Sequence, residues 1–187
     1  MATDVKNVTA AKPKVGGAIW SAPLGTALPT DAKTALNAAF KCLGFLSEDG
    51  LTNEDIRESD EIQAWGGDIV ATPQTSKSDK FKYKMIEALN IDVLKEVYGP
   101  SNVTGTLETG IKVVSTSEEL PSHALVFEIA LKDGILKRIV VPNGKVSEVG
   151  EIPYVDNDVT GYDTTLQAFP DTTIGGTHVE YIAKGGD

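Results

Sequence analysis

The chain has 187 residues, 41% of them hydrophobic and 24% charged, a composition typical of one globular domain that buries a core without metals or disulfides. A formal charge of -10 is the wrong sign for neutralising phosphates, which argues against tight nucleic-acid binding. Cys42 is the only cysteine, so an intramolecular disulfide and a thiolate metal cluster are excluded.

The N-terminal segment, residues 1–16, is predicted to be an extended arm because its residues are small and polar and Pro13 lies near its end. It has no basic stretch followed by an apolar one, and the apolar run at 124–131 is too short to span a bilayer, so neither a signal sequence nor a membrane segment is expected. A first strand is expected at 17–20. Apolar residues at helical spacing indicate a short helix from Thr30 to Phe40.

Residues 47–66 are dense in carboxylates and offer few apolar side chains to bury, so we predict a long exposed acidic loop there. Trp65 is the exception. An aromatic residue at the end of such a loop is suited to anchoring it on a partner, and packing at the start of the next strand is the alternative. We treat the loop as a candidate assembly element, with these residues: Glu48, Asp49, Glu54, Asp55, Glu58, Asp60, Glu61 and Trp65.

The rest of the chain is predicted to be strand with one helix. Lysines alternate with apolar residues at 80–85, which indicates a half-buried strand, and a helix is expected over 90–99, between a capping Asn90 and a terminating Gly99. Strands follow at 111–116, 123–131, 135–143, 145–152, 161–169 and 177–183, with Asp133-Gly134 and Asn143-Gly144 as hairpin signals. We therefore expect one domain over 1–187, mainly β, built as an antiparallel β-sandwich or barrel flanked by one α-helix, with a long acidic loop and extended terminal arms.

No catalytic pattern is found in the sequence. His123 and His178 lie outside any nucleophile or base motif, and no phosphate-binding glycine motif occurs. Residues 156–161 place oxygen ligands and a glycine as a calcium loop does, but Gln167 stands where that loop needs a bidentate Glu. We expect no enzyme activity, no cofactor and no metal site, and leave open whether the 156–161 turn binds a cation.

Five stretches, read in order, resemble the major tail proteins, or tail tube proteins, of siphophages of Gram-positive hosts. They are VGGAIWSAPLGTALPTDA, LGFLSEDGLTNEDI, DEIQAWGGDIV, DKFKYKMIEALNIDVLKEVYG and GYDTTLQAFPD. The resemblance implies hexameric rings stacked into a tube around a tape measure protein, with tail terminator and distal tail proteins as further partners. It also implies a lumen through which the genome passes without specific binding, and a place in the virion tail after assembly in the host cytoplasm.

A tube wall that repels DNA needs negative charge facing inward, because duplex DNA is itself strongly negative. On the strand expected at 159–169, one face offers Asp163, Thr165 and Gln167, which makes these residues candidates for lining the lumen. The alternative is that the acidic residues only keep the outer surface soluble.

Two other functions fit the same composition. A β-sandwich binding or decoration module on a virion or cell surface also lacks a catalytic site, but it would stay a small discrete species in solution. A hydrolase that uses the acidic loop would need a pocket and a carboxylate with a perturbed pKa. We rank the decoration module above the hydrolase and the tail tube above both.

Overall fold

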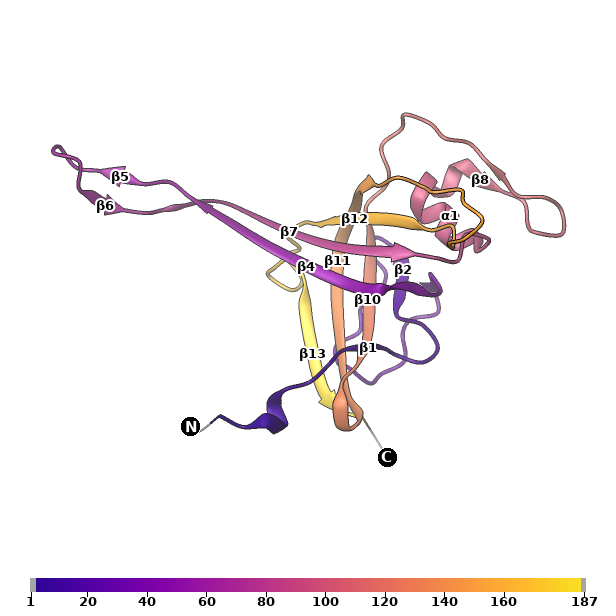
Figure 1. Cartoon of the computed structure of the whole chain (residues 1–187), viewed down its shortest axis with the longest axis horizontal. Helices are drawn as coiled ribbons and strands as arrows, with labels where there is room; N and C mark the ends of the chain where they lie inside the picture. The colour runs from indigo at the N-terminus through magenta and orange to yellow at the C-terminus, as the bar shows by residue number, and fades with distance from the viewer. Residues whose placement is uncertain (1–2, 186–187) are drawn as a thin grey trace.

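An antiparallel sheet dominates the structure, a computed structural model that describes residues 3–185 (Figure 1). Seven strands follow the order β3-β2-β10-β11-β12-β7-β4, while β1 pairs with β10 and β13 pairs with β11. Two further two-stranded ladders, β5-β6 and β8-β9, lie outside this sheet. The strands are β1 (Lys12–Pro13), β2 (Ile19–Pro23), β3 (Lys41–Cys42), β4 (Leu46–Ser59), β5 (Ile62–Gln63), β6 (Ile69–Ala71), β7 (Gln74–Met85), β8 (Val103–Thr104), β9 (Lys112–Val113), β10 (His123–Ala130), β11 (Ile135–Val149), β12 (Tyr162–Ala168) and β13 (Val179–Lys184).

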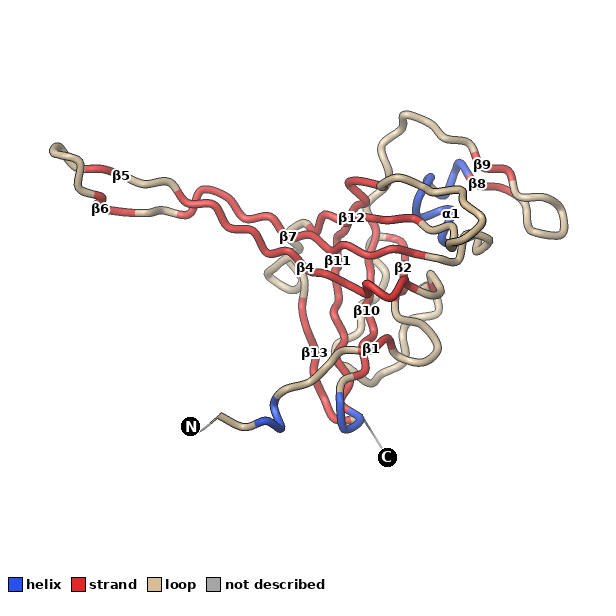
Figure 2. Tube along the Cα trace, viewed as in Figure 1, coloured by secondary structure: helices blue, strands red, loops and turns tan. Residues whose placement is uncertain are grey.

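The sheet folds over on itself because β11 has different partners along its length. Its first half pairs with β13 and its second half with β12, so that β12, β7 and β4 run across β10, β11 and β13 in Figure 2. The two layers face each other as a β-sandwich and do not close into a barrel within the described residues. The predicted sandwich is therefore confirmed.

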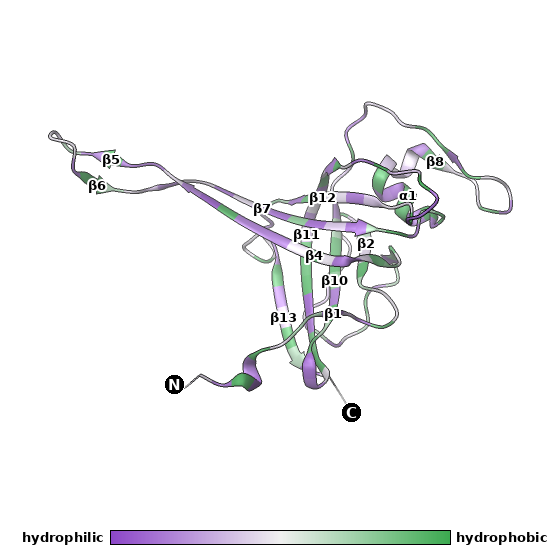
Figure 3. Ribbon diagram, viewed as in Figure 1, coloured by the Kyte–Doolittle hydropathy of each residue, from purple (hydrophilic) through white to green (hydrophobic). Residues whose placement is uncertain are grey.

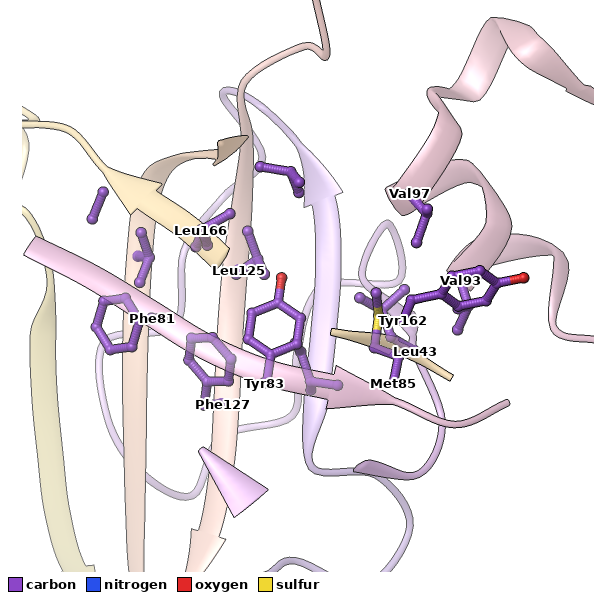
Figure 4. Packing of buried hydrophobic residues seen from close by; sticks show 14 of the residues in the cluster. Leu43, Phe81, Tyr83, Met85, Val93, Val97, Leu125, Phe127, Tyr162 and Leu166 are labelled. Carbon is purple, nitrogen blue, oxygen red and sulfur yellow. The ribbon is translucent and has the colours of Figure 1, made fainter. Parts of the chain in front are cut away.

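The core lies between these two layers. Phe81 of β7 stacks on Phe127 of β10 with ring centroids 5.3 Å apart, and Tyr83 meets Phe127 edge-on at 5.7 Å (Figure 4). Both rings of β7 point inward because the intervening lysines take the other face of the strand, as the period-two pattern predicts. Each fully buried side chain of this size adds about 1.5–3 kcal/mol to the stability of the sandwich.

The α-helix, α1 (Ile91–Tyr98), covers one end of the sandwich where the sequence predicts it. The Asn90 side chain accepts a hydrogen bond from the Asp92 amide (3.0 Å), and Gly99, at φ 94°, ends the helix. Val93 and Val97 are buried against the core. Three short 3-10 turns, Val5–Asn7, Pro100–Asn102 and Lys132–Gly134, complete the helical structure of residues 3–185.

The helix expected from Thr30 to Phe40 is wrong, because this segment forms a chain of bends over the opposite face of β10 and β11. The Asp31 carboxylate accepts hydrogen bonds from the Lys33 and Thr34 amides (2.6 Å each), which offers the backbone an alternative to a helix. The buried Arg138 guanidinium then donates to the carbonyls of Asp31 (2.7 Å) and Thr34 (2.9 Å), which a helix would use for its own hydrogen bonds.

Of the two predicted hairpin turns, one forms. Asp133 and Gly134 adopt positive φ (56° and 69°) between β10 and β11, as expected. The turn at Asn143-Gly144 is wrong, since β11 runs through it to Val149. A Cβ on Gly144 would lie 2.9 Å from Leu166, so this glycine serves the close approach of β12.

Candidate assembly surfaces

The acidic stretch is a strand and not a loop, which corrects the sequence prediction. Most of residues 47–66 belongs to β4, which pairs with β7 from Leu51 opposite Tyr83 to Ser59 opposite Gln74. Its carboxylates find cations on β7: Glu54 contacts Lys82 (2.7 Å) and Asp55 contacts Lys77 (3.7 Å). Exposed pairs add little stability each, but these two offset part of the repulsion between the carboxylates of the strand.

Every residue from 55 to 77 is exposed, and Figure 1 shows β4 and β7 leaving the body together as a long arm. The candidate residues are therefore spread along it and do not form one site. Glu48 and Asp49 lie near the body, Glu54, Asp55 and Glu58 along the strand, and Asp60, Glu61 and Trp65 toward the tip.

A buried carboxylate fixes the base of the arm. Asp79 of β7 is 1% exposed, and it accepts hydrogen bonds from Asn53 of β4 (2.7 Å) and from Thr177 (2.5 Å), while Nδ1 of His178 lies 2.6 Å away. Burial raises the pKa of Asp79, but these hydrogen bonds more than offset it, so that the pKa lies below its ordinary value of 3.8. His178 also meets Phe81 edge-on at 5.3 Å. This cluster joins the arm to the connection between β12 and β13.

The tip of the arm is apolar and exposed. Gly66 and Gly67 form its turn at positive φ, and the side chain of Trp65 is fully exposed. In Figure 3 the largely hydrophilic arm gives way to a hydrophobic segment at β6. Large apolar side chains presented together at the end of an arm mark an interaction surface. We name them the arm tip, and their exposed fractions are Ile62 51%, Trp65 107%, Ile69 53% and Val70 61%. The sequence prediction includes only Trp65 of these residues, although the apolar residues on both sides of Gly66-Gly67 are the signal for the others.

The three candidate lumen residues share one face of β12, with their side chains away from the core. Asp163 is exposed, Gln167 is half-buried and Thr165 is buried, at 8% exposure. Each lies opposite a lysine of β7: Asp163 opposite Lys84, Thr165 opposite Lys82, and Gln167 opposite Lys80. This face is therefore mixed in charge, and not acidic as a repelling wall at this strand would need. Hydrogen bonding to Glu54 raises the pKa of Lys82, and the charges of Glu54, Glu148 and Asp163 raise it further.

The N-terminal segment lies along the sheet as a thin exposed strip from residue 3, and residues 1–2 lie outside the described part of the chain. β1 pairs with the end of β10, Lys14 forms an ion pair with Glu128, and the Lys132 amide donates to the Thr9 hydroxyl (3.0 Å). At the other end of the chain, residues 179–184 form β13 in the sheet and are not a free arm.

Chemistry at a catalytic or metal centre has little support in residues 3–185. No three or more His, Cys, Asp and Glu side chains gather there as metal ligands, and Asp156 and Asp158 lie in an exposed bend. No helix among these residues is both long and apolar enough to cross a membrane. The features that stand out are surfaces: a projecting arm, an apolar tip and a strand with an open edge. They define a structural subunit that works by associating with other proteins.

The chain belongs to the phage tail tube proteins, because the model of the family described as "Phage tail tube protein" matches residues 1–184. No match is found among curated proteins. Tail tube proteins are structural and not enzymatic, they assemble into a tube with other tail proteins, and their place is the virion tail. The hydrolase reading is thereby set aside.

Proposed function

We propose that this chain builds the tail tube of a siphophage as stacked hexameric rings, through which DNA is ejected. A tape measure protein would occupy the lumen during assembly in the host cytoplasm, and tail terminator and distal tail proteins would cap the two ends. The observation that carries the proposal is the projecting arm, since a single copy gains nothing from holding an apolar tip in solvent.

The length of the arm supports a contact between copies. At about 3.3 Å per residue, residues 56–65 carry the tip roughly 30 Å beyond the body, which is about the diameter of a small domain. Burial of each large apolar side chain of the arm tip contributes about 1.5–3 kcal/mol. Several such side chains together offset much of the entropy lost on association.

Open strand edges support a ring. β4 pairs with β7 on one side only, so over residues 46–55 its other edge presents unpaired main-chain groups within the described chain. A neighbouring copy that adds its own edge there would satisfy these groups, and repetition around an axis closes the ring. The family favours this over the decoration module, which has no use for an unpaired edge.

We propose further that the outer face of β12 and β7 lines the lumen, with Asp163, Thr165 and Gln167 on it. Lysines of β7 oppose all three, and Glu54, Glu148 and Asp163 lie close enough to Lys82 to raise its pKa. A lining whose charges balance locally gives DNA few uncompensated cations to bind, since phosphate binding depends on freely available Lys and Arg.

Negative-stain imaging of the purified protein over a range of concentrations tests the tube. We expect tubes above a critical concentration, whereas particles that stay small and discrete at every concentration would support the decoration module. The matched variant replaces residues 58–76 by Asn-Gly, which closes a two-residue hairpin between Arg57 and Lys77 and keeps the base of the arm.

This arm-free variant should melt as cooperatively as the parent and form no tubes. Removal of residues 48–61, which make up most of the acidic stretch, is unsuitable, because it takes away Leu51, which packs on the core, and Asn53, which binds Asp79. Tubes of normal length from the arm-free variant would contradict the role of the arm.

A further inference from the structure

A pocket of about 340 Å³ opens in the body beside α1, and none of its lining residues belongs to the arm. Apolar side chains dominate its lining, among them Leu24, Leu43, Leu120 and Pro121. Leu24 is 53% exposed, so part of this apolar surface faces solvent in the single subunit. A pocket of this size and character suits a large apolar or aromatic group.

A buried polar pair makes the walls of the pocket rigid. Glu96 of α1 accepts a hydrogen bond from Ser21 of β2 (3.0 Å), and its other oxygen lies 2.6 Å from Nε2 of His123 on β10. The side chains of Glu96 and His123 are 5% and 12% exposed. Three elements are therefore tied together at the wall, and the pocket is preformed.

Two lysines line the pocket, together with the carboxylate of Asp92 and that of Glu96, which is already held by Ser21 and His123. Lys41 is exposed and Lys95 is half-buried, both belong to the lining, and neither forms an ion pair within residues 3–185. The arm tip has the complementary character, since Asp60, Glu61 and Asp68 flank its apolar residues. Exposed Lys41, which forms no ion pair within residues 3–185, therefore favours an approach of the acidic residues that flank the arm tip.

We infer that the arm tip of one copy docks in this pocket of the next copy, with Trp65 inserted between Leu24 and Leu120 and Glu61 beside Lys41. This inference rests on the proposed function and names the surface that receives the arm. In Figure 1 the arm extends away from α1, so a copy does not fill its own pocket. Contacts between two different surfaces propagate from copy to copy, and along a tube they give an open stack.

Cross-linking tests the contact in assembled tubes. With Cys42→Ser as the background, no native thiol remains. Subunits carrying Ala64→Cys, next to Trp65, are mixed with subunits carrying Ser122→Cys, at the pocket, and oxidised after assembly. We expect disulfide-linked dimers of the two variants. The matched control pairs Ala64→Cys with Thr173→Cys, an exposed position outside the pocket lining, and should give none.

A charge exchange provides a second measurement that does not depend on thiols. Lys41→Glu should raise the critical concentration for tube formation about tenfold or more, and Glu61→Lys in the same chain should restore it, because the pair is then reversed and not removed. Lys33→Glu, an exposed lysine outside the pocket, is the control and should change little.

The outcomes separate this inference from the proposed function. Tubes that yield no 64–122 cross-link, or equal 64–122 and 64–173 cross-links, or no rescue by Glu61→Lys, would overturn docking in this pocket. If Trp65→Ala nevertheless abolished tubes, the arm would keep its assembly role with another receiving surface. If Trp65→Ala assembled at the parent's critical concentration, both the docking and the role of the arm tip would be wrong.

Discussion

Replacing Asp79 by Asn should release the base of the arm and destabilise the body. The carboxylate is 1% exposed and meets three polar side chains at 2.5–2.7 Å, from β4 and from the connection between β12 and β13. A hydrogen bond to a buried charge contributes about 1.5–3 kcal/mol, and an amide turns one donor toward neighbours that themselves donate. We expect a loss of about 2–4 kcal/mol in the free energy of unfolding.

Chemical denaturation of the single subunit, below the concentration at which tubes form, measures this loss. Asp55→Asn is the matched control, because Asp55 lies directly opposite Asp79 in the ladder but its side chain is 36% exposed and contacts Arg57 and Lys77. Its loss should stay under about 1 kcal/mol. Equal losses from the two variants would refute the claim that the cluster at Asp79 holds the arm.

The difference in the free energy of unfolding between the parent and Asp79→Asn should decrease as pH falls. Because hydrogen bonding lowers the pKa of Asp79 below 3.8 in the folded chain, its contribution is complete above about pH 4 and disappears as pH falls through the folded pKa. Parent and Asp79→Asn should therefore converge in stability as pH falls below 3.8 and through the folded pKa. A gap of unchanged size at low pH would show that Asp79 acts through packing alone.

Three further predictions address other parts of the molecule. Burial lowers the pKa of His123, but Glu96 raises it more, to above 6.5. The stability that this pair gives should therefore be complete below about pH 6.5 and be lost as pH rises through the folded pKa. Thermal melts of the parent should show this loss, and those of His123→Gln should not. Amide exchange should be fast at 3–11 and 60–70 in the single subunit and slow in tubes, and protection already present in dilute subunits would contradict this. Asp163→Lys should assemble normally but slow genome ejection, most at low salt, and ejection at the parent rate in dilute buffer would remove this residue from the lumen.

Local patterns in the sequence account for the elements whose partners are near in the chain. The α1 helix follows from Asn90, Gly99 and the apolar stripe between them, and the inward face of β7 follows from the alternation at 80–85. The arm is predicted as a loop because its partner strand is distant in the sequence. Two of its carboxylates, Glu54 and Asp55, pair with Lys82 and Lys77, which come more than twenty residues later, whereas Arg57 is the only cation nearby in the sequence.

Partners that are distant in the sequence also explain why the predicted turn at Asn143-Gly144 and the predicted helix from Thr30 are wrong. Asn143-Gly144 has the composition of a turn, but the approach of Leu166 from β12 requires a glycine in a continuous strand. The segment from Thr30 has helical spacing, but a buried arginine more than one hundred residues away takes the carbonyls of Asp31 and Thr34. Among the assembly candidates, Trp65 is fully exposed beside the turn at Gly66 and Gly67, so it does not pack at the start of the next strand, and its role in assembly stays a prediction.

The hydrogen bonds from Arg138 to the carbonyls of residues 30–40 determine which positions of that segment tolerate substitution. The guanidinium binds main-chain oxygens on one side and Glu128 on the other, so it recognises the path of the backbone and not the side chains it carries. Exposed positions such as Lys33 and Ala35 are therefore free to change, while a lysine in place of Arg138 lacks the planar fork that holds all three partners at once. The segment offers a part of the subunit surface where labels or new chemical groups can be introduced without moving the sandwich beneath it.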